Sequence, residues 1–269
     1  MHKTLHFNIE QLRPYINWVY FMHAWGLTGK LQAERQKMMA EANNMLDAMQ
    51  QYRTHAIVGL YAACSDGDDI IVDGYRMPML RQQHADNESA KYLCLADFVP
   101  PLQSGIDERI GVFAATVDEA MEHDFCHDDY ERMLAQTIAD RLAEATAELT
   151  HLMVRRYIWG YAPHEHLTID ELHKERFQGI RPAVGYPSMP DTSLNFIIDN
   201  IINMKSIGIR LTQSGAMKPH ASVSGLMIAH PEAHYFDVGK IGKDQLCDYA
   251  RRRGVPTELM RRFLASRLQ

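Results

Sequence analysis

The chain lacks the glycine-rich motifs by which most proteins hold nucleotides. Its 269 residues contain no Gly-x-Gly-x-x-Gly sequence and no P-loop, which excludes the standard dinucleotide and nucleoside-triphosphate sites. The glycine-rich loop that follows the first strand of Rossmann-like methyltransferases has no candidate either. No Ser-His-Asp signature is visible, and the serines of the segment Ser222–Gly225 do not stand in a nucleophile elbow. The sequence therefore offers neither a standard nucleotide fold nor a nucleophilic triad.

Cysteine is scarce and scattered. Cys64, Cys94, Cys126 and Cys247 form no Cys-x-x-Cys pair, and four isolated thiols in a chain of this length fit the reducing cytosol better than a disulfide framework. Long apolar runs are also missing. None approaches the roughly 20 residues that a membrane helix needs, and the first residues lack the apolar core of a signal peptide. We therefore expect a cytoplasmic protein with no membrane partner.

An excess of positive charge is absent as well. The sequence has 28 Lys and Arg residues against 34 Asp and Glu residues, which gives a net charge of −6. A nucleic-acid partner calls for a basic surface, so we expect no nucleic acid as a partner. With 46% hydrophobic residues the chain can bury a substantial core, and its length suits one large domain or two small ones.

Histidine is plentiful, yet it forms no metal motif. The 14 histidines include two clusters, His123–His127 and His164–His166, the first of which contains Cys126. Histidines at positions i and i+4 can share one face of a helix and bind a metal together. Neither cluster has a matched second pair of ligands, so the sequence predicts no functional metal site.

Helices are predicted near both ends of the chain and at its centre. Asn8 is a candidate cap for a helix that runs to about Trp25, and a second helix is predicted over Leu31–Gln51. The longest is predicted over Asp128–Tyr157, because its apolar residues form a stripe at helical spacing. Shorter helices are predicted at a capping box that starts at Thr168, from Asp191 to Ile202, over Lys243–Arg253 with Gly254 as the C-terminal cap, and over Thr257–Arg267.

Strand candidates lie between these helices without alternating with them. They comprise a hairpin of Ala56–Ala63 and Ile70–Asp73, single strands at Tyr92–Val99 and Ile110–Val117, and a hairpin of Ser222–Ala229 and Tyr235–Val238. Because strands and helices do not alternate regularly, a parallel βαβ sheet is disfavoured. The pattern predicts the α+β fold class.

One short segment is well suited to present side chains to a ligand. Gly179–Pro187 contains two glycines, two prolines, Arg181 and Tyr186. Because proline fixes φ and glycine frees it, this segment is neither a regular helix nor a central strand. Arg181 offers a fork of donors that suits a carboxylate, and Tyr186 offers an aromatic face and a hydroxyl. An ordered loop of this kind suits a small zwitterionic ligand; a Pro/Gly turn with a surface arginine is the plain alternative.

Five further segments form a distinctive pattern: Leu142–Ala145, Trp159–Pro163, Ala216–Gly225, His230–Phe236 and Asp244–Arg252. In this order and spacing they resemble the C-terminal activation domain of cobalamin-dependent methionine synthase, which binds S-adenosylmethionine (SAM) and presents it to the corrinoid cofactor. The resemblance runs from about Leu12 to Leu264. It implies a single domain over residues 1–269, with an N-terminal helical part at about 8–51 and a core at about 55–269. The implied sheet is twisted, largely antiparallel and flanked by helices.

The resemblance also implies which residues contact SAM. Arg181 is implied to bind the carboxylate, and Glu144 to lie beside the amino or sulfonium end, although a lone glutamate on a helix is otherwise an exposed residue. Backbone groups around Ala183 and Gly185 are implied to reach the adenine or ribose. The remaining implied site residues are Tyr235 and Phe236 at the SAM site and Tyr186 as the residue nearest the corrinoid.

Two places depart from the family pattern. The family typically has an aspartate at the position of Asn17, as an acidic SAM contact; asparagine keeps the shape and an acceptor oxygen but loses the charge. Thr192–Leu194 replaces a common His-Thr-Glu sequence at the edge that faces the corrinoid in the family. Asp140, in contrast, matches a family acid that engages a histidine of the cobalamin domain, with a surface carboxylate as the open alternative.

The sequence lacks the motifs that would bind cobalamin or homocysteine, and this absence shapes the functional hypothesis. The sequence has no Asp-x-His-x-x-Gly cobalamin box, no cysteine group for a homocysteine zinc site and no room for two catalytic barrels. The resemblance therefore implies a stand-alone activation component of a methyltransferase, without turnover alone and without catalytic acid–base residues. It would bind SAM and support reductive methylation of cob(II)alamin in trans, with cobalamin held only by a partner methionine synthase and a flavodoxin-type protein as electron donor. Two alternatives stay open: a non-catalytic SAM or corrinoid sensor, and an activator of another corrinoid methyltransferase.

Overall fold

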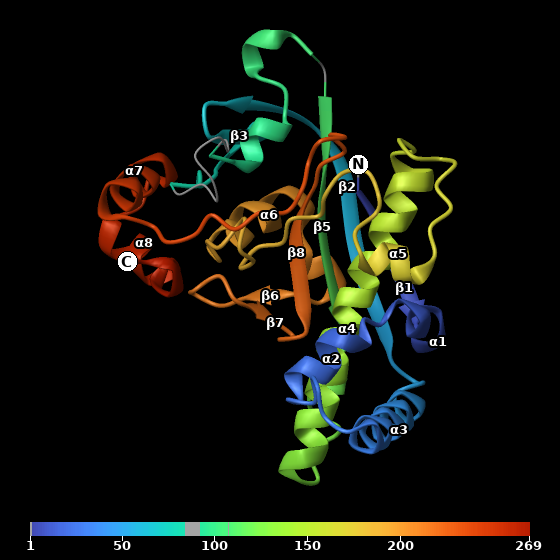
Figure 1. Cartoon of the computed structure of the whole chain (residues 1–269). Coiled ribbons are helices and arrows are strands. Elements are labelled where there is room, and N and C mark those ends of the chain that lie inside the picture. Colours follow the sequence, from blue (N-terminus) through green and yellow to red (C-terminus); the bar gives the residue numbers. More distant parts are fainter. Residues whose placement is uncertain (1, 84–91, 107) are drawn as a thin grey trace.

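The computed structural model describes residues 2–83, 92–106 and 108–269. Two long antiparallel strands, β2 (Arg53–Asp66) and β5 (Glu108–Val117), form its centre (Figure 1). β8 (Ser222–Met227) pairs with the outer edge of β5. The other edge of β2 is shared by β1 (His2–Asn8) and by β3 (Asp69–Val72), and β3 continues into β4 (Tyr75–Pro78). All these pairs are antiparallel, so the predicted sheet type is confirmed.

The sheet is covered on both faces, because its central strands alternate their side chains between two cores. Ala56 and Val58 of β2 point into the core under α4 (Asp129–Met153), whereas Ile57 between them points into the core under α6 (Leu194–Ile202). Phe113 and Ala114 of β5 divide between the two cores in the same way. This period of two is the geometry of a strand that is buried on both sides. The predicted α+β class is confirmed.

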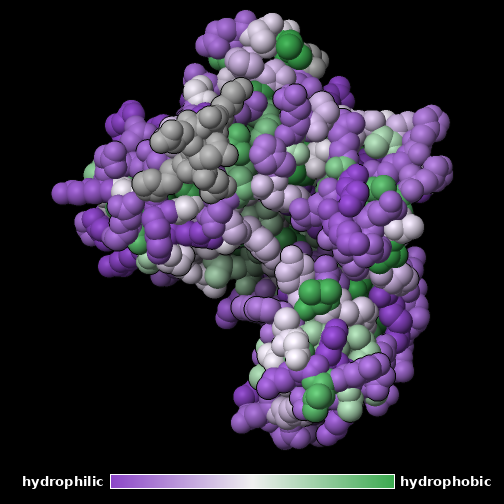
Figure 2. Space-filling model, in the orientation of Figure 1, coloured by the Kyte–Doolittle hydropathy of each residue, from purple (hydrophilic) through white to green (hydrophobic). Residues whose placement is uncertain are grey.

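α4 extends past the end of the sheet (Figure 1). Asp128 caps it by accepting a hydrogen bond from the backbone N–H of Glu131, and a π-helical turn, Val154–Ile158, extends its end. The first half of α4 protrudes and carries α2 (Trp18–Ala24) and α3 (Gln32–Ala48), which together form a lower lobe (Figure 1). Figure 2 shows a deep indentation of the surface where this lobe meets the body of the molecule.

The predicted helix from Asn8 to Trp25 is two helices. Asn8 does cap the first, α1 (Ile9–Leu12), through a 2.9 Å hydrogen bond from the backbone N–H of Gln11. Pro14 then interrupts the pattern, because it lacks an N–H and restricts the residue before it. A 3₁₀ turn at Arg13–Tyr15 results, and α2 starts only after Asn17.

The C-terminal helices form a third, smaller core with the strand end near Leu80. α7 (Lys243–Arg253) ends at Gly254, whose φ of +66° confirms the predicted glycine cap. α8 (Thr257–Phe263) is shorter than predicted. Ion pairs tie α7 to the body: Arg252 pairs with Asp69, and Arg253 pairs with the buried Asp191 at 3.1 Å.

Two predicted strands were wrong. Tyr92–Val99 contains a 3₁₀ turn at Leu95–Phe98, because the Asp97 carboxylate accepts a 2.9 Å hydrogen bond from the backbone N–H of Cys94 and closes the turn locally. Tyr235–Val238 is irregular, because it packs against the loop before Met189 instead of pairing with β8; the backbone N–H of Val238 donates to the carbonyl of Pro187.

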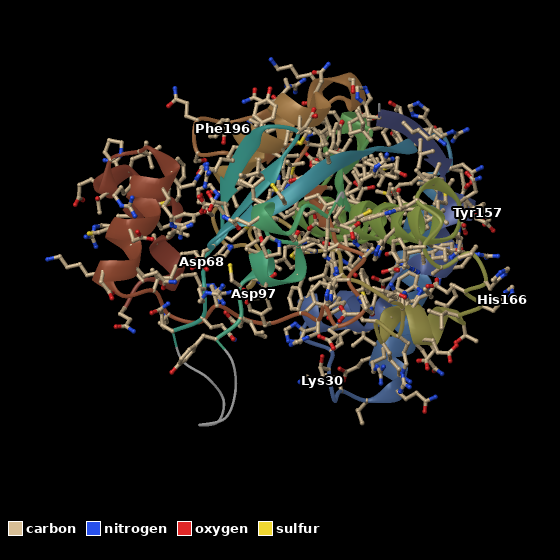
Figure 3. The ribbon with its side chains drawn as sticks, turned by 90° about the horizontal axis from the view of Figure 1, so that it is seen from above. Lys30, Asp68, Asp97, Tyr157, His166 and Phe196 are labelled. Atoms are coloured by element: carbon tan, nitrogen blue, oxygen red, sulfur yellow. The ribbon has the colours of Figure 1, made fainter. Side chains whose placement is uncertain are left out.

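The remaining elements are short. They are α5 (Ile169–His173), whose Thr168 capping box is confirmed, the small hairpin of β6 (Arg210–Leu211) and β7 (Met217–Lys218), and 3₁₀ turns at Leu102–Ser104, Glu119–Glu122, Met204–Ile207 and Ala265–Arg267. Arg81 links the turn between β2 and β3 to the 3₁₀ turn at Leu95–Phe98, because its guanidinium donates hydrogen bonds to both Asp68 and Asp97. Figure 3 shows these two aspartates near each other beside the C-terminal helices. Among the described helices, none combines the length and the apolar content needed to cross a membrane.

Candidate functional site

A cleft with a volume of about 600 Å³ lies between the N-terminal helices, the middle of α4 and the loop that follows Gly179. Five chain segments that are far apart in sequence form its wall, together with Val223 of β8. They contribute Tyr15, Asn17 and Tyr20; Arg141, Glu144 and Glu148 of α4; Leu172, His173 and Glu175; residues of the loop Arg181–Ser188; and the segment Tyr235–Asp237. A cleft of this size accommodates a ligand of nucleoside dimensions.

Seven of the eight sequence-predicted site residues line this cleft: Asn17, Glu144, Arg181, Ala183, Tyr186, Tyr235 and Phe236. Gly185 does not. It is exposed, with a φ of +90°, and its N–H donates a 2.8 Å hydrogen bond to the carbonyl of Met189. Its position therefore fits a role in turning the loop between Ala183 and Tyr186, since few residues other than glycine adopt this φ.

The loop is held in place by β8. Backbone hydrogen bonds join Ile180 to Ile228, Pro182 to Leu226 and Val184 to Ser224. This close approach needs Gly225, because a Cβ there would lie 2.1 Å from the carbonyl oxygen of Pro182. The loop is therefore a rigid extension of the sheet edge, and it presents the Arg181 side chain to the cleft from a fixed backbone.

Three contacts fix Arg181. Its backbone N–H donates to the Tyr235 hydroxyl at 2.8 Å, its Nη2 donates to Glu148 Oε2 at 3.2 Å, and its Nη1 donates to His151 Nδ1 at 3.3 Å. Burial alone would lower the pKa of Arg181, but the charge of Glu148 beside it raises the pKa above its usual value. The guanidinium is therefore a permanent cation in the cleft wall.

His151 supports Arg181 as a neutral acceptor. The ring is fully buried, and burial together with the positive charges of Arg155 and Arg181 holds the pKa of His151 well below its usual value. A neutral ring whose Nδ1 accepts from Arg181 carries its proton on Nε2. That nitrogen lies 3.4 Å from the hydroxyl of Tyr161, which in turn donates to the carbonyl of Gln178. This chain of partners sets the tautomer of the ring.

The cleft has more carboxylate groups than guanidinium groups. Glu144, Glu148, Glu175 and Asp237 face two guanidinium groups, those of Arg141 and Arg181. Burial raises the pKa of Glu175, and burial with the charge of Glu144 raises that of Tyr186, whose hydroxyl donates to Glu144. With Tyr15, Tyr20 and Phe236 in the same wall, the arrangement suits a flat ligand that carries a carboxylate and an excess of positive charge.

The side chain of Asn17 has a structural role in the cleft wall. Its Oδ1 accepts a 3.1 Å hydrogen bond from the backbone N–H of Val19 and so caps α2. Cap positions favour asparagine and aspartate about equally. The departure from the family pattern at this position is therefore neutral for the helix, and the difference it makes is the charge that faces the cleft.

The other family-related positions lie outside the cleft. Asp140 is one turn before Glu144 on α4, 3.6 Å from the exposed His220, and burial raises its pKa. In the departure at Thr192–Leu194, Ser193 is buried; its hydroxyl donates to Asp191 and accepts from Arg253. Within this departure, Ser193 therefore helps to hold α7 against the body of the molecule.

Four residues with charged side chains, Arg141, Glu148, Glu175 and Asp237, line the cleft but are not among the residues predicted from the sequence. A signal for two of them exists, because Arg141, Glu144 and Glu148 recur at three- and four-residue spacing on one face of α4. Within residues 2–83, 92–106 and 108–269, no group of three or more His, Cys, Asp or Glu side chains is placed to hold a metal ion.

Comparison with known proteins agrees with this geometry. The family model described as the vitamin B12 dependent methionine synthase activation domain matches residues 8–254. The chain belongs to this family. Among solved structures, the crystal structure of the MetH reactivation domain bound to AdoHcy matches 100% of this chain and 90% of that chain, with 39% sequence identity and a TM-score of 0.91. The resemblance inferred from sequence motifs and the fold that it implied are therefore confirmed.

Proposed function

We propose that this activation-domain chain binds SAM in the cleft and supports the reductive methylation of cob(II)alamin held by a partner methionine synthase, acting in trans. One observation carries the proposal: the cleft brings Arg181, Glu144 and Tyr235, which come from three distant segments, to one wall. The solved relative is described with AdoHcy, the product that SAM leaves after methyl transfer. The four free thiols of the chain support a cytoplasmic setting.

The ligand's charges match those of the cleft. The SAM carboxylate would accept hydrogen bonds from Arg181, while its ammonium and sulfonium groups would lie among the four carboxylates. SAM carries one net positive charge, and the cleft carries more carboxylates than guanidinium groups. The aromatic side chains of Tyr186, Tyr235 and Phe236 offer flat surfaces to the adenosine or to the sulfonium.

The chemistry that we propose needs a positioned methyl donor and an external electron. A flavodoxin-type donor supplies one electron to the partner's cob(II)alamin; the carbon–sulfur bond of SAM breaks as the carbon–cobalt bond forms, and S-adenosylhomocysteine leaves. This chain contributes by holding SAM in one orientation, which removes the entropy cost of the encounter. No protein acid or base takes part, so the proposal assigns no catalytic residue to the chain and expects no turnover from the chain alone.

The test mixes the purified chain with a methionine synthase that ends after its cobalamin domain and is held as cob(II)alamin. SAM and a one-electron reductant are added, and methylcobalamin is followed by its absorption spectrum. We expect methylcobalamin only when both the chain and SAM are present. SAM binding by calorimetry without methylcobalamin formation, across several partner enzymes, would favour a SAM-sensing role instead. Absence of SAM binding would refute the assignment of the cleft.

A further inference from the structure

Two histidines meet on the strand pair at the edge of the sheet. His6 of β1 lies directly opposite His55 of β2 in the antiparallel register. Their Nδ1 atoms are 2.7 Å apart, and the two rings stand edge to face with their centroids 4.9 Å apart. Because the two histidines are 49 residues apart in the sequence, no local motif reveals the pair.

Asp118, which follows β5, sets the tautomer of His55. Its Oδ1 lies 2.8 Å from His55 Nε2, and its Oδ2 accepts a 2.6 Å hydrogen bond from the backbone N–H of Arg53. Because a carboxylate only accepts hydrogen bonds, the neutral His55 ring carries its hydrogen on Nε2 and has a bare Nδ1. In the short contact between the rings, His6 Nδ1 is then the donor. A bare imidazole nitrogen of fixed orientation therefore points at a second imidazole.

The contact with Asp118 is the support that metal-binding histidines commonly have. A histidine that binds a metal through one ring nitrogen almost always donates the N–H of the other to a carboxylate, a carbonyl or water, which orients the ring and makes it a stronger ligand. His55 has this support. A neutral His6 can exchange its hydrogen between Nδ1 and Nε2 without a change of charge, and this exchange leaves two bare Nδ1 atoms that face each other.

We propose that His6 and His55 together bind one divalent transition-metal ion, such as Zn²⁺, through their Nδ1 atoms. Imidazole nitrogen suits ions of this class. Two nitrogens on one tetrahedral zinc ion lie about 3.3 Å apart, so the rings must separate by about 0.6 Å from their present contact. The His6 ring can move in this way because the residue is exposed. Water fills the other coordination positions, since no group of three or more protein ligands occurs in the described part of the chain.

The ion would join an exposed edge strand to the centre of the sheet. Phe7 is the one buried residue of β1, so few apolar contacts hold this strand in place, and Asn8 at its end caps α1. A metal bridge between β1 and β2 adds a contact that does not depend on burial. Neither histidine lines the cleft, so the metal site is independent of the function proposed for the chain.

The experiment titrates the chelator-treated chain with Zn²⁺ by calorimetry and compares His6→Gln with the parent. We expect His6→Gln to bind one zinc ion fewer than the parent. The matched control is His2→Gln, four residues earlier on the same face of β1, because His2 lies opposite Gly59 and has no histidine across from it. This control should keep the site. Asp118→Asn should weaken zinc binding at the site by about tenfold to a hundredfold, the range for a residue that orients a metal ligand.

The melting temperature gives a second readout, because an ion that binds only the folded chain stabilises it. Zn²⁺ should raise the melting temperature of the parent and of His2→Gln by a common amount, and that of His6→Gln by less. Equal zinc binding by His6→Gln and the parent would show that the ion binds adventitiously at other side chains, and the proposal would be overturned. A parent chain that binds no zinc would also overturn it, and the contact between the rings would then be a hydrogen bond that joins two strands.

Discussion

The backbone N–H of Arg181 donates a 2.8 Å hydrogen bond to the hydroxyl oxygen of Tyr235. This contact joins the rigid loop after Gly179 to an irregular segment that has no strand of its own. Burial, only partly offset by Arg181, raises the pKa of Tyr235 to about 12, so the phenol stays neutral at any working pH. The hydroxyl therefore fixes the backbone of Arg181 with its oxygen and keeps its own hydrogen for another acceptor.

Tyr235→Phe tests this contact. The change keeps the ring and leaves the N–H of Arg181 without its acceptor, so we expect the free energy of unfolding to fall by about 1–3 kcal/mol. Urea denaturation followed by circular dichroism measures the difference. Tyr157→Phe is the control, because the Tyr157 side chain is exposed and its change should alter stability little. Equal stability of Tyr235→Phe and the parent would show that water replaces the hydroxyl.

Arg181→Ala tests the carboxylate site. Loss of a charge-assisted, two-point contact is expected to cost about 1.5–3 kcal/mol, or roughly a tenfold to hundredfold weaker affinity for SAM in calorimetry. The affinity for 5′-methylthioadenosine, which has no carboxylate, should not change. The variant also leaves Glu148 unpaired in the cleft wall, so its melting temperature must be measured beside its affinity. Unchanged SAM binding would mean that the carboxylate lies elsewhere.

Gly225→Ala tests the docking of the loop on β8. A methyl group 2.1 Å from the carbonyl oxygen of Pro182 forces the loop away from the strand, so we expect a loss of about 1–3 kcal/mol in stability together with weaker SAM binding. Gly111→Ala, on the neighbouring strand, meets the Met227 side chain instead. It should cost stability but leave the affinity for SAM unchanged. Equal effects of both variants on affinity would indicate that the loop is not placed by Gly225.

The parts of the fold with strong periodicity could be predicted from the sequence. The apolar stripe of α4 and the β-branched runs of β2 and β5 carry their own signal. β1 does not, because it is an edge strand in which only Phe7 is buried, so its sequence shows no apolar face. The strand predicted at Tyr92–Val99 failed because the side chain of Asp97 competes locally with sheet pairing.

The site could be predicted only through the family pattern. Arg181 and Tyr186 stand in a motif with its own local chemistry, but Tyr235 looks like an ordinary strand residue until its hydroxyl is placed against Arg181. Glu148 carries no signal of its own, because a single glutamate on a long helix is usually exposed; its one sequence signal is its spacing from Arg141 and Glu144 on α4. Its burial against Arg181 is a property of the assembled cleft, since the two residues come from different elements.

The buried thiol of Cys94 predicts a loss of stability at alkaline pH. Burial raises the pKa of Cys94 from 9.0 to about 12, so the unfolded chain releases this proton first. The contribution of the protonated thiol is full below pH 9 and declines as the pH rises toward 12, by about 1.4 kcal/mol at pH 10. Urea denaturation at pH 7.5 and pH 10 should therefore show that the free energy of unfolding falls less between these two pH values for Cys94→Ala than for the parent. Cys126→Ala, at an exposed thiol, should follow the parent.

Asn17→Asp tests the departure of this chain from its family. Aspartate caps a helix as well as asparagine does, so α2 should keep its hydrogen bond from the N–H of Val19 and the melting temperature should change little. The added carboxylate would face the cationic end of SAM in a cleft wall that is partly open to water. We expect SAM binding to tighten by about 1 kcal/mol, and this gain should shrink with added salt and below the pKa of the new carboxylate.

The comparison of two ligands makes this prediction specific. S-adenosylhomocysteine lacks the sulfonium charge, so its gain in calorimetry should be smaller than that of SAM if Asn17 faces the sulfonium. Equal gains for both ligands would identify the ammonium as the partner of position 17. No gain for either ligand, in a variant that melts like the parent, would mean that the Asn17 side chain serves the helix cap and does not reach the ligand.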